Sequence, residues 1–280
     1  MTRTTRHKQI LSLLALCLLL TASLPGQATI RHPLLDAGLT LLEQGNIFIE
    51  RYNQVTGAQI EARYELGLPY FFGGRYESRF LQVFEAWQDS GFFKTGRNYI
   101  GGLDCYGLAK WMARQAGQPK PPVLSELTGS GWRHREHFLD LAGIPYDQLH
   151  LSLEIGDYIV LKHGYNHVMI YMGTLRDYGY EAATLPRALA PYIDYPLFLQ
   201  SGINHYQGAW YTRYIGDQGY RTVDTTDGGV SVAIWGVPVE AAPFSERPQQ
   251  ALCHFFRLDG TAIMVPDMAQ YSLVRFYRHR

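Results

Sequence analysis

The stretch GGLDCYGLAKWMARQAG, residues 101–117, places a cysteine between a glycine-rich approach and an amphipathic run. The run repeats apolar residues at helical spacing; its stripe consists of Leu108, Trp111, Met112 and Ala116. This spacing predicts a helix over residues 105–116, with Asp104 as its N-cap. Cys105 then lies at a helix N-terminus, where the backbone field lowers the pKa of a thiol and directs N–H groups toward a developing oxyanion.

The first 28 residues have the layout of a secretory signal peptide. A basic segment, MTRTTRHK, precedes the apolar run QILSLLALCLLLTASL, and Gly26 and Ala28 have the spacing of a cleavage site. The apolar run is short for a membrane-spanning helix, and an uncleaved anchor is the alternative. We therefore expect a secreted, periplasmic protein with no stable membrane span after removal of the leader.

The composition excludes one broad class of partner. The chain has 25 basic and 25 acidic side chains, and removal of the three basic residues of the leader leaves 22 basic against 25 acidic. Nucleic-acid binding needs a basic surface, and this balance gives no sign of one. No nucleic-acid partner is expected.

Helical patterns come first in the chain and strand patterns later. Helical spacing extends over residues 34–66. Strands are predicted at 156–163, 166–173, 195–202, 229–239 and 271–278, together with a hairpin over 252–266 that turns at Asp259 and Gly260. This order predicts an α+β fold with N-terminal helices packed on an antiparallel sheet. The organisation that we expect is a signal peptide (1–28), an N-terminal helical segment (29–60) and a catalytic domain with insertions (61–280), in which residues 204–250 form an insertion or a flap.

A thiol nucleophile needs a base, and His167 is the best candidate among ten histidines. It opens the apolar strand HVMIYMG, so its ring can be held beside the core, whereas His163 lies at the other side of the same turn. His134 and His137 have helical spacing, but no cysteine or Glu-x-x-His pattern accompanies them. We expect no metal site and no cofactor.

A structural disulfide is the alternative for Cys105. Without the leader, Cys105 and Cys253 are the two cysteines that remain, and exported proteins commonly pair such residues. Cys253 lies in ALCHFF, which has the character of a buried strand, where a small apolar thiol is ordinary. The contrast between the two neighbourhoods favours two thiols.

Three blocks of the chain resemble, in order, the signatures of the NlpC/p60 family of papain-like cell-wall cysteine peptidases. They are LGLPYFFGG (66–74), LDCYGLAKWM (103–112) and EIGDYIVLKHGYNHVMIYMG (154–173). The order of cysteine before histidine, 62 residues apart, is also similar. The resemblance implies a papain-like NlpC-type fold.

The resemblance also implies roles for individual residues. Cys105 matches the nucleophile and His167 the base. The motif FLQSG looks like the family's block with the third polar residue and places Gln200 there, where an amide oxygen can accept a hydrogen bond from the imidazole. Other candidates for this third position are Asp177, Glu181 and His205.

Three further residues, Tyr70, Asp104 and Tyr106, occupy positions that face the substrate in the family. Tyr70 matches a tyrosine near the thiol, and Asp104 matches the aspartate before the nucleophile. Two residues depart from the pattern: Phe72 replaces a tryptophan, and Tyr106 replaces the small serine after the nucleophile. The change at Tyr106 bears on which peptide the site accepts.

The resemblance implies a hydrolase that cleaves an amide bond in peptidoglycan stem peptides, with peptidoglycan or its muropeptides as the partner. The alternatives are an amidase or acyltransferase of the same superfamily that acts on another amide or a lipid, and a non-catalytic wall-binding module. The lipid-acyl branch typically has histidine before cysteine, the opposite of the order here.

Overall fold

The computed structural model describes residues 31–43, 46–57, 59, 62–64, 67–70, 74, 76, 102–129, 132–163, 165–202, 210–214, 220–224, 229–236, 242–246, 255–256, 262–263 and 273–278. The predicted signal peptide, the turn at Asp259 and Gly260, Cys253 and His205 lie outside these residues. No helix within the described ranges has the length and apolarity needed to cross a membrane.

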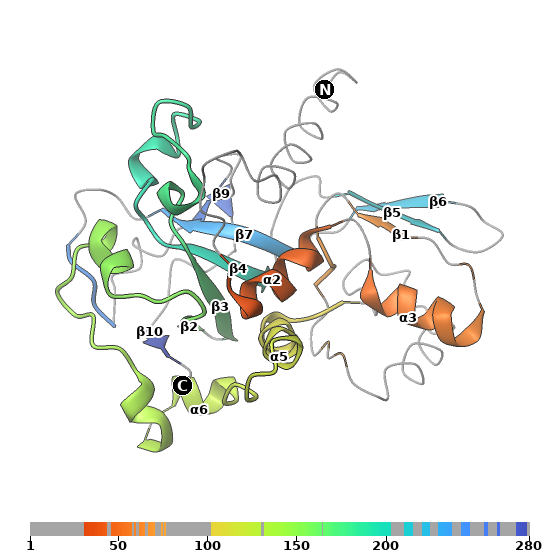
Figure 1. Ribbon diagram of the computed structural model, residues 1–280, viewed down its shortest axis with the longest axis horizontal. Coiled ribbons are helices and arrows are strands. Elements are labelled where there is room, and N and C mark those ends of the chain that lie inside the picture. Colours follow the sequence, from red (N-terminus) through yellow and green to blue (C-terminus); the bar gives the residue numbers. More distant parts are fainter. Residues whose placement is uncertain are drawn as a thin grey trace.

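The described residues form a main sheet of seven antiparallel strands in the order β10-β2-β3-β4-β7-β8-β9 (Figure 1). The strands are β2 (Tyr158–His163), β3 (Tyr165–Gly173), β4 (Leu197–Gly202), β7 (Gly229–Trp235), β8 (Phe255–Phe256), β9 (Ala262–Ile263) and β10 (Leu273–Tyr277). Each strand predicted from the sequence is present, and the predicted hairpin is the pair β8 and β9. Together with the helices this sheet confirms the α+β class.

The prediction of helix over residues 34–66 is wrong at its end, because residues 62–64 form a strand of a second sheet. Helix α3 (Ile47–Thr56) ends at Gly57, which has a left-handed backbone (φ 74°) and serves as its C-cap. The strand β1 (Ala62–Tyr64) then pairs with β5 (Trp210–Tyr214), which pairs with β6 (Tyr220–Asp224). A partner about 150 residues away in the chain overrides the local helical pattern. Part of the region 204–250 therefore completes this sheet.

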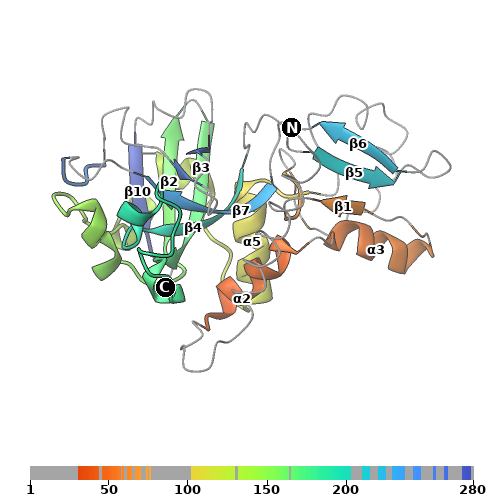
Figure 2. The same cartoon turned by 90° about the horizontal axis from the view of Figure 1, so that it is seen from above.

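The remaining helices surround the main sheet. They are α2 (Pro33–Leu39), η1 (Thr40–Leu42), α5 (Cys105–Gln115), α6 (Leu124–Thr128), η3 (Trp132–His137), η4 (Tyr146–Leu151), η5 (Arg176–Tyr178) and η6 (Ala190–Tyr192). The helix predicted over 105–116 is α5, which packs against α2, β3 and β4 (Figure 2). Close packing needs Gly38, where an added Cβ would lie 2.6 Å from the Met112 side chain.

One hydrophobic core joins the N-terminal helices to the sheet. Leu34 and Leu35 of α2 are 1% exposed and belong to the same cluster as Met112 of α5 and Phe198 of β4. Burial of each such side chain contributes roughly 1.5–3 kcal/mol. The first helices are therefore integral to the core that holds α5 against the strands.

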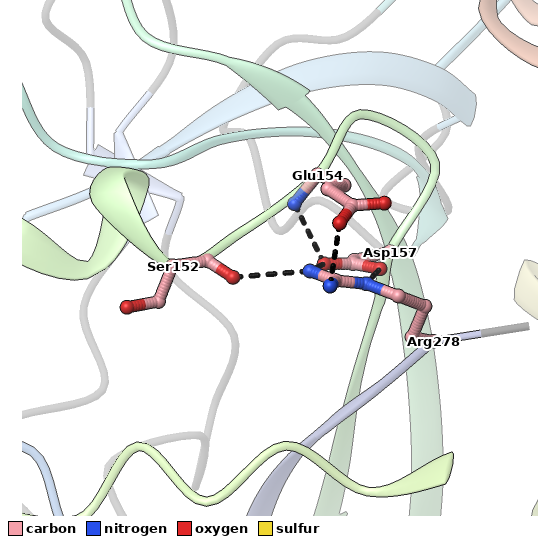
Figure 3. Close-up of polar contacts among 4 residues, drawn as sticks. All are labelled: Ser152, Glu154, Asp157 and Arg278. Carbon is pink, nitrogen blue, oxygen red and sulfur yellow. Dashed lines mark hydrogen bonds and ion pairs between the residues drawn. The ribbon is translucent and has the colours of Figure 1, made fainter.

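A partly buried ion pair fixes residue 278 to the start of β2 (Figure 3). Arg278 donates from Nε to Asp157 Oδ1 at 2.8 Å and from a terminal nitrogen to Asp157 Oδ2 at 2.7 Å. The same guanidinium contacts the Glu154 carboxylate at 2.7 Å and the Ser152 carbonyl oxygen at 3.0 Å. Since Asp157 is 2% exposed, this bidentate pair holds β10 in register beside β2.

Candidate active site

The N-terminus of α5 carries the thiol. Asp104 has an extended backbone and its Oδ1 accepts a hydrogen bond from the N–H of Gly107 at 2.6 Å, so it is the N-cap that the sequence predicted. Cys105 is the first residue of the helix, is 7% exposed and carries a thiol in the structure. Its position gives it the field of the helix N-terminus, which favours the thiolate.

The first sequence block lies directly beside the segment that leads into α5. Tyr70 forms a parallel bridge with Leu103, and the N–H of Leu103 donates to the carbonyl oxygen of Pro69 at 3.0 Å. Tyr70 is 8% exposed. The structure thus brings Tyr70 next to the approach to Cys105, and a role in substrate binding stays a prediction.

His167 lies near the start of β3 and contacts Gln200 of β4. The His167 Nε2 and Gln200 Oε1 atoms are 3.0 Å apart. An amide oxygen can only accept, so Nε2 must carry the proton in this hydrogen bond. In the neutral ring, Nδ1 then has the lone pair and is the atom that can take up a proton.

The environment of His167 favours its neutral form. Burial lowers its pKa below the ordinary value, while the hydrogen bond to Gln200 and the charge of Asp104 act in the opposite direction. Because burial has the largest effect, the imidazole is uncharged at neutral pH. The influence of Asp104 also shows that the start of α5 lies within electrostatic reach of the ring.

Small residues next to Gln200 make room for this contact. A Cβ added at Gly202 would lie 3.0 Å from Gln200 Oε1 and 3.3 Å from His167 Cε1. On the other side, Gln200 is paired with Ser231 of β7, and its Nε2 lies 3.5 Å from the Ser231 hydroxyl. The motif FLQSG includes Gly202 without indicating this contact, and Ser231 was not predicted because nothing beyond its place in a strand marks it.

The other candidates for the third position lie in different surroundings. Asp177 Oδ2 accepts hydrogen bonds from the N–H and the hydroxyl of Thr174, in the turn after β3. Glu181 is exposed, and His205 is outside the described residues. The contact expected of an orienting residue is the one that Gln200 makes.

Tyr106 points into the protein. It is 7% exposed, and its hydroxyl donates to the carbonyl oxygen of Pro121 at 2.9 Å. The aromatic ring that replaces a small serine is therefore anchored beneath the loop that follows α5. Its predicted role in substrate selection would have to act through this loop.

Metal ligation has no support within the described ranges, where no group of three histidine, cysteine, aspartate or glutamate side chains is placed to hold an ion. His137 contacts the neighbouring Glu136 at 3.4 Å.

Comparison of the chain with models of protein families, with curated proteins and with solved structures found no match.

Proposed function

We propose that the protein is a papain-like cysteine hydrolase with Cys105 as the nucleophile, His167 as the base and Gln200 as the residue that orients the imidazole. The observation that carries the proposal is the hydrogen bond between His167 Nε2 and Gln200 Oε1, on strands that pack against α5. This bond leaves Nδ1 as the basic nitrogen. It supplies the third member that a Cys–His pair needs to keep one tautomer.

The chemistry follows from these positions. The Cys105 sulfur attacks the carbonyl carbon of an amide while His167 takes the thiol proton, and N–H groups at the start of α5 stabilise the oxyanion. The C–N bond breaks when His167 returns the proton to the leaving amine. Water then attacks the thioester with His167 as base, which releases the acid and restores the thiol.

The substrate that we propose is the stem peptide of peptidoglycan, cleaved at an amide next to a D-configured γ-glutamyl residue. The support is the resemblance of three ordered blocks to cell-wall peptidases, two of which meet at Leu103 and Tyr70 in space. The apolar leader with its cleavage pattern would deliver the chain to the periplasm, where this substrate lies.

Mass spectrometry of muropeptides incubated with the purified chain tests the proposal. We expect fragments that differ by hydrolysis of one stem-peptide amide, and we expect Cys105→Ala to lose several orders of magnitude in rate while it keeps its fold. Unchanged muropeptides would refute peptidoglycan hydrolysis and leave an amidase or acyltransferase of other specificity, or a wall-binding module. Equal digestion by Cys105→Ala would refute the mechanism.

A further inference from the structure

A second side chain of β4 reaches the segment that leads into the nucleophile. Ser201 is 0% exposed, and its Oγ donates to the carbonyl oxygen of Leu103 at 2.7 Å, across 98 residues of sequence. The N–H of Leu103 is held by Pro69 at 3.0 Å. Both backbone polar groups of this residue, two positions before Cys105, are therefore fixed from outside its own segment.

We propose that Ser201 is a positioning residue that sets the place of the Cys105 thiol relative to the His167–Gln200 pair. The inference rests on the proposed function, because it assigns Ser201 to the same site. Ser201 does not touch the substrate in this assignment and acts through the backbone of Leu103.

The planarity of the peptide group lets the Ser201 hydroxyl fix the backbone beyond Leu103. The Leu103 carbonyl and the Asp104 N–H belong to one planar peptide group, so a hydrogen bond that holds the oxygen also fixes the direction of the following amide. Asp104 in turn caps the first turn of α5 through Gly107. The bond from Ser201 thus controls how the chain enters the helix that begins with Cys105.

The same short piece of β4 holds both halves of the site. Gln200 orients the imidazole of His167, and the next residue, Ser201, holds Leu103 in the segment that leads to Cys105. A displacement of about 1 Å at a reacting group can lower the rate roughly a hundredfold.

A hydroxyl that only stabilises the fold provides the matched control. Thr128 is 4% exposed, and its Oγ1 donates to the carbonyl oxygen of Leu124 at 2.8 Å within α6. Thr128→Val removes a partly buried hydrogen bond from a hydroxyl to a backbone carbonyl oxygen, without changing any contact of Leu103. Loss of either bond leaves a carbonyl oxygen without this donor and lowers stability.

The experiment compares Ser201→Ala, Ser201→Thr, Ser201→Val and Thr128→Val with the parent chain. It measures kcat and KM on muropeptides, and the pH profile of iodoacetamide alkylation at Cys105, followed by peptide mass spectrometry. We expect Ser201→Ala to lower kcat roughly ten- to a hundredfold at nearly constant KM. We expect its alkylation midpoint to move upward toward about 8.5, the value of an ordinary thiol. Thr128→Val should change neither.

The Thr and Val variants at 201 keep the test decisive if Ser201→Ala does not fold. They have the same shape and differ in the hydroxyl, so the inference predicts a higher kcat and a lower alkylation midpoint for Ser201→Thr. A parent chain without hydrolytic activity, but with an alkylation profile that Ser201→Ala shifts, would refute the proposed substrate and support the positioning role. Parent-like kcat and alkylation in Ser201→Ala, or in both Thr and Val variants, would overturn the role of Ser201.

Discussion

Two partly buried polar contacts join distant parts of the chain, and they differ in how many of their polar atoms are engaged. Two nitrogens of the Arg278 guanidinium donate to the two carboxylate oxygens of Asp157, and the third donates to Glu154, so all three nitrogens are engaged (Figure 3). The His167–Gln200 contact is a single hydrogen bond between neutral groups that involves one ring nitrogen. In the ion pair, every nitrogen of the guanidinium donates a hydrogen bond. In the His167–Gln200 contact, only Nε2 is engaged, so Nδ1 can still take up a proton.

The pKa values of the two basic groups are shifted in opposite directions. The hydrogen bond to Asp157 raises the pKa of Arg278, so its charge persists at every pH at which the protein is folded. Burial lowers the pKa of His167, which keeps the ring neutral and ready to accept a proton near pH 7. The first contact is expected to govern stability and the second to govern turnover.

The largest effect on stability is expected from Arg278→Ala. It leaves the Asp157 carboxylate, 2% exposed, without its guanidinium partner, although the backbone N–H of Glu154 still donates to Oδ2. Removing one partner of a buried pair costs roughly 3–5 kcal/mol, and the partial exposure of Arg278 places the expected loss near the lower figure. Urea denaturation measures it.

Arg278→Lys is the matched variant for this prediction. It keeps the charge but cannot form the bidentate contact, so its loss of stability should be smaller than that of Arg278→Ala. Under conditions in which both variants stay folded, kcat should remain near the parent value. A large fall in kcat in either folded variant would show that the Arg278–Asp157 pair also affects turnover, contrary to this prediction.

The extent to which the sequence predicts these features depends on how local they are. Helix α5 was predictable because Asp104, the apolar stripe and Gly117 lie within one short segment. Strands β3 and β4 were predictable because each is a short apolar run that ends at a glycine. The contact of His167 with Gln200 came from a resemblance between motifs, since nothing in the spacing of residues 167 and 200 requires it.

Features that depend on long-range contacts were not predicted. Strand β1 forms because it pairs with β5, and the helical spacing of the preceding residues did not indicate a strand there. The bond from Ser201 to Leu103 spans 98 residues, and the pair between Arg278 and Asp157 spans 121. Such contacts follow from the completed fold, because a local pattern specifies an element without specifying its partner.

Gln200→Ala should affect turnover more than stability. Loss of the acceptor frees the imidazole to adopt the wrong tautomer or rotation, but Cys105, His167 and the helix N-terminus remain. We expect kcat to fall roughly ten- to a thousandfold with KM nearly unchanged, and unfolding in urea to change little. Gln200→His, the residue common in the resembled family, should recover much of the loss.

Alanine variants of the other candidates complete this comparison. If Gln200 orients the imidazole, Asp177→Ala, Glu181→Ala and His205→Ala should each keep kcat within a few-fold of the parent chain. A parent-like Gln200→Ala together with a strong defect in one of the three would reassign the third position. Steady-state rates on one muropeptide for all four variants decide between these outcomes.

The smallest expected effect is on the pH dependence of stability, and it has a definite sign. The pKa of His167 in the folded chain lies below the value of about 6.5 that an exposed histidine has in the unfolded chain. Between these two values the unfolded chain binds more protons, so the free energy of unfolding decreases as the pH falls through this window. Each pKa unit between the folded and unfolded values changes the free energy of unfolding by about 1.4 kcal/mol at most. The Arg278 charge does not change in this range.

Variants separate this contribution from that of the carboxylates, which titrate at lower pH. His167→Gln removes the titrating ring, so its melting temperature should fall less than that of the parent chain between pH 7.5 and 5. Gln200→Ala removes a contact that raises the pKa of His167, so the acid loss should be larger than in the parent. Thermal melts at several pH values, with an NMR titration of the His167 ring, test this order. The same acid slope in His167→Gln and the parent would show that His167 does not resist protonation, and the neutral base assigned to the site would then be wrong.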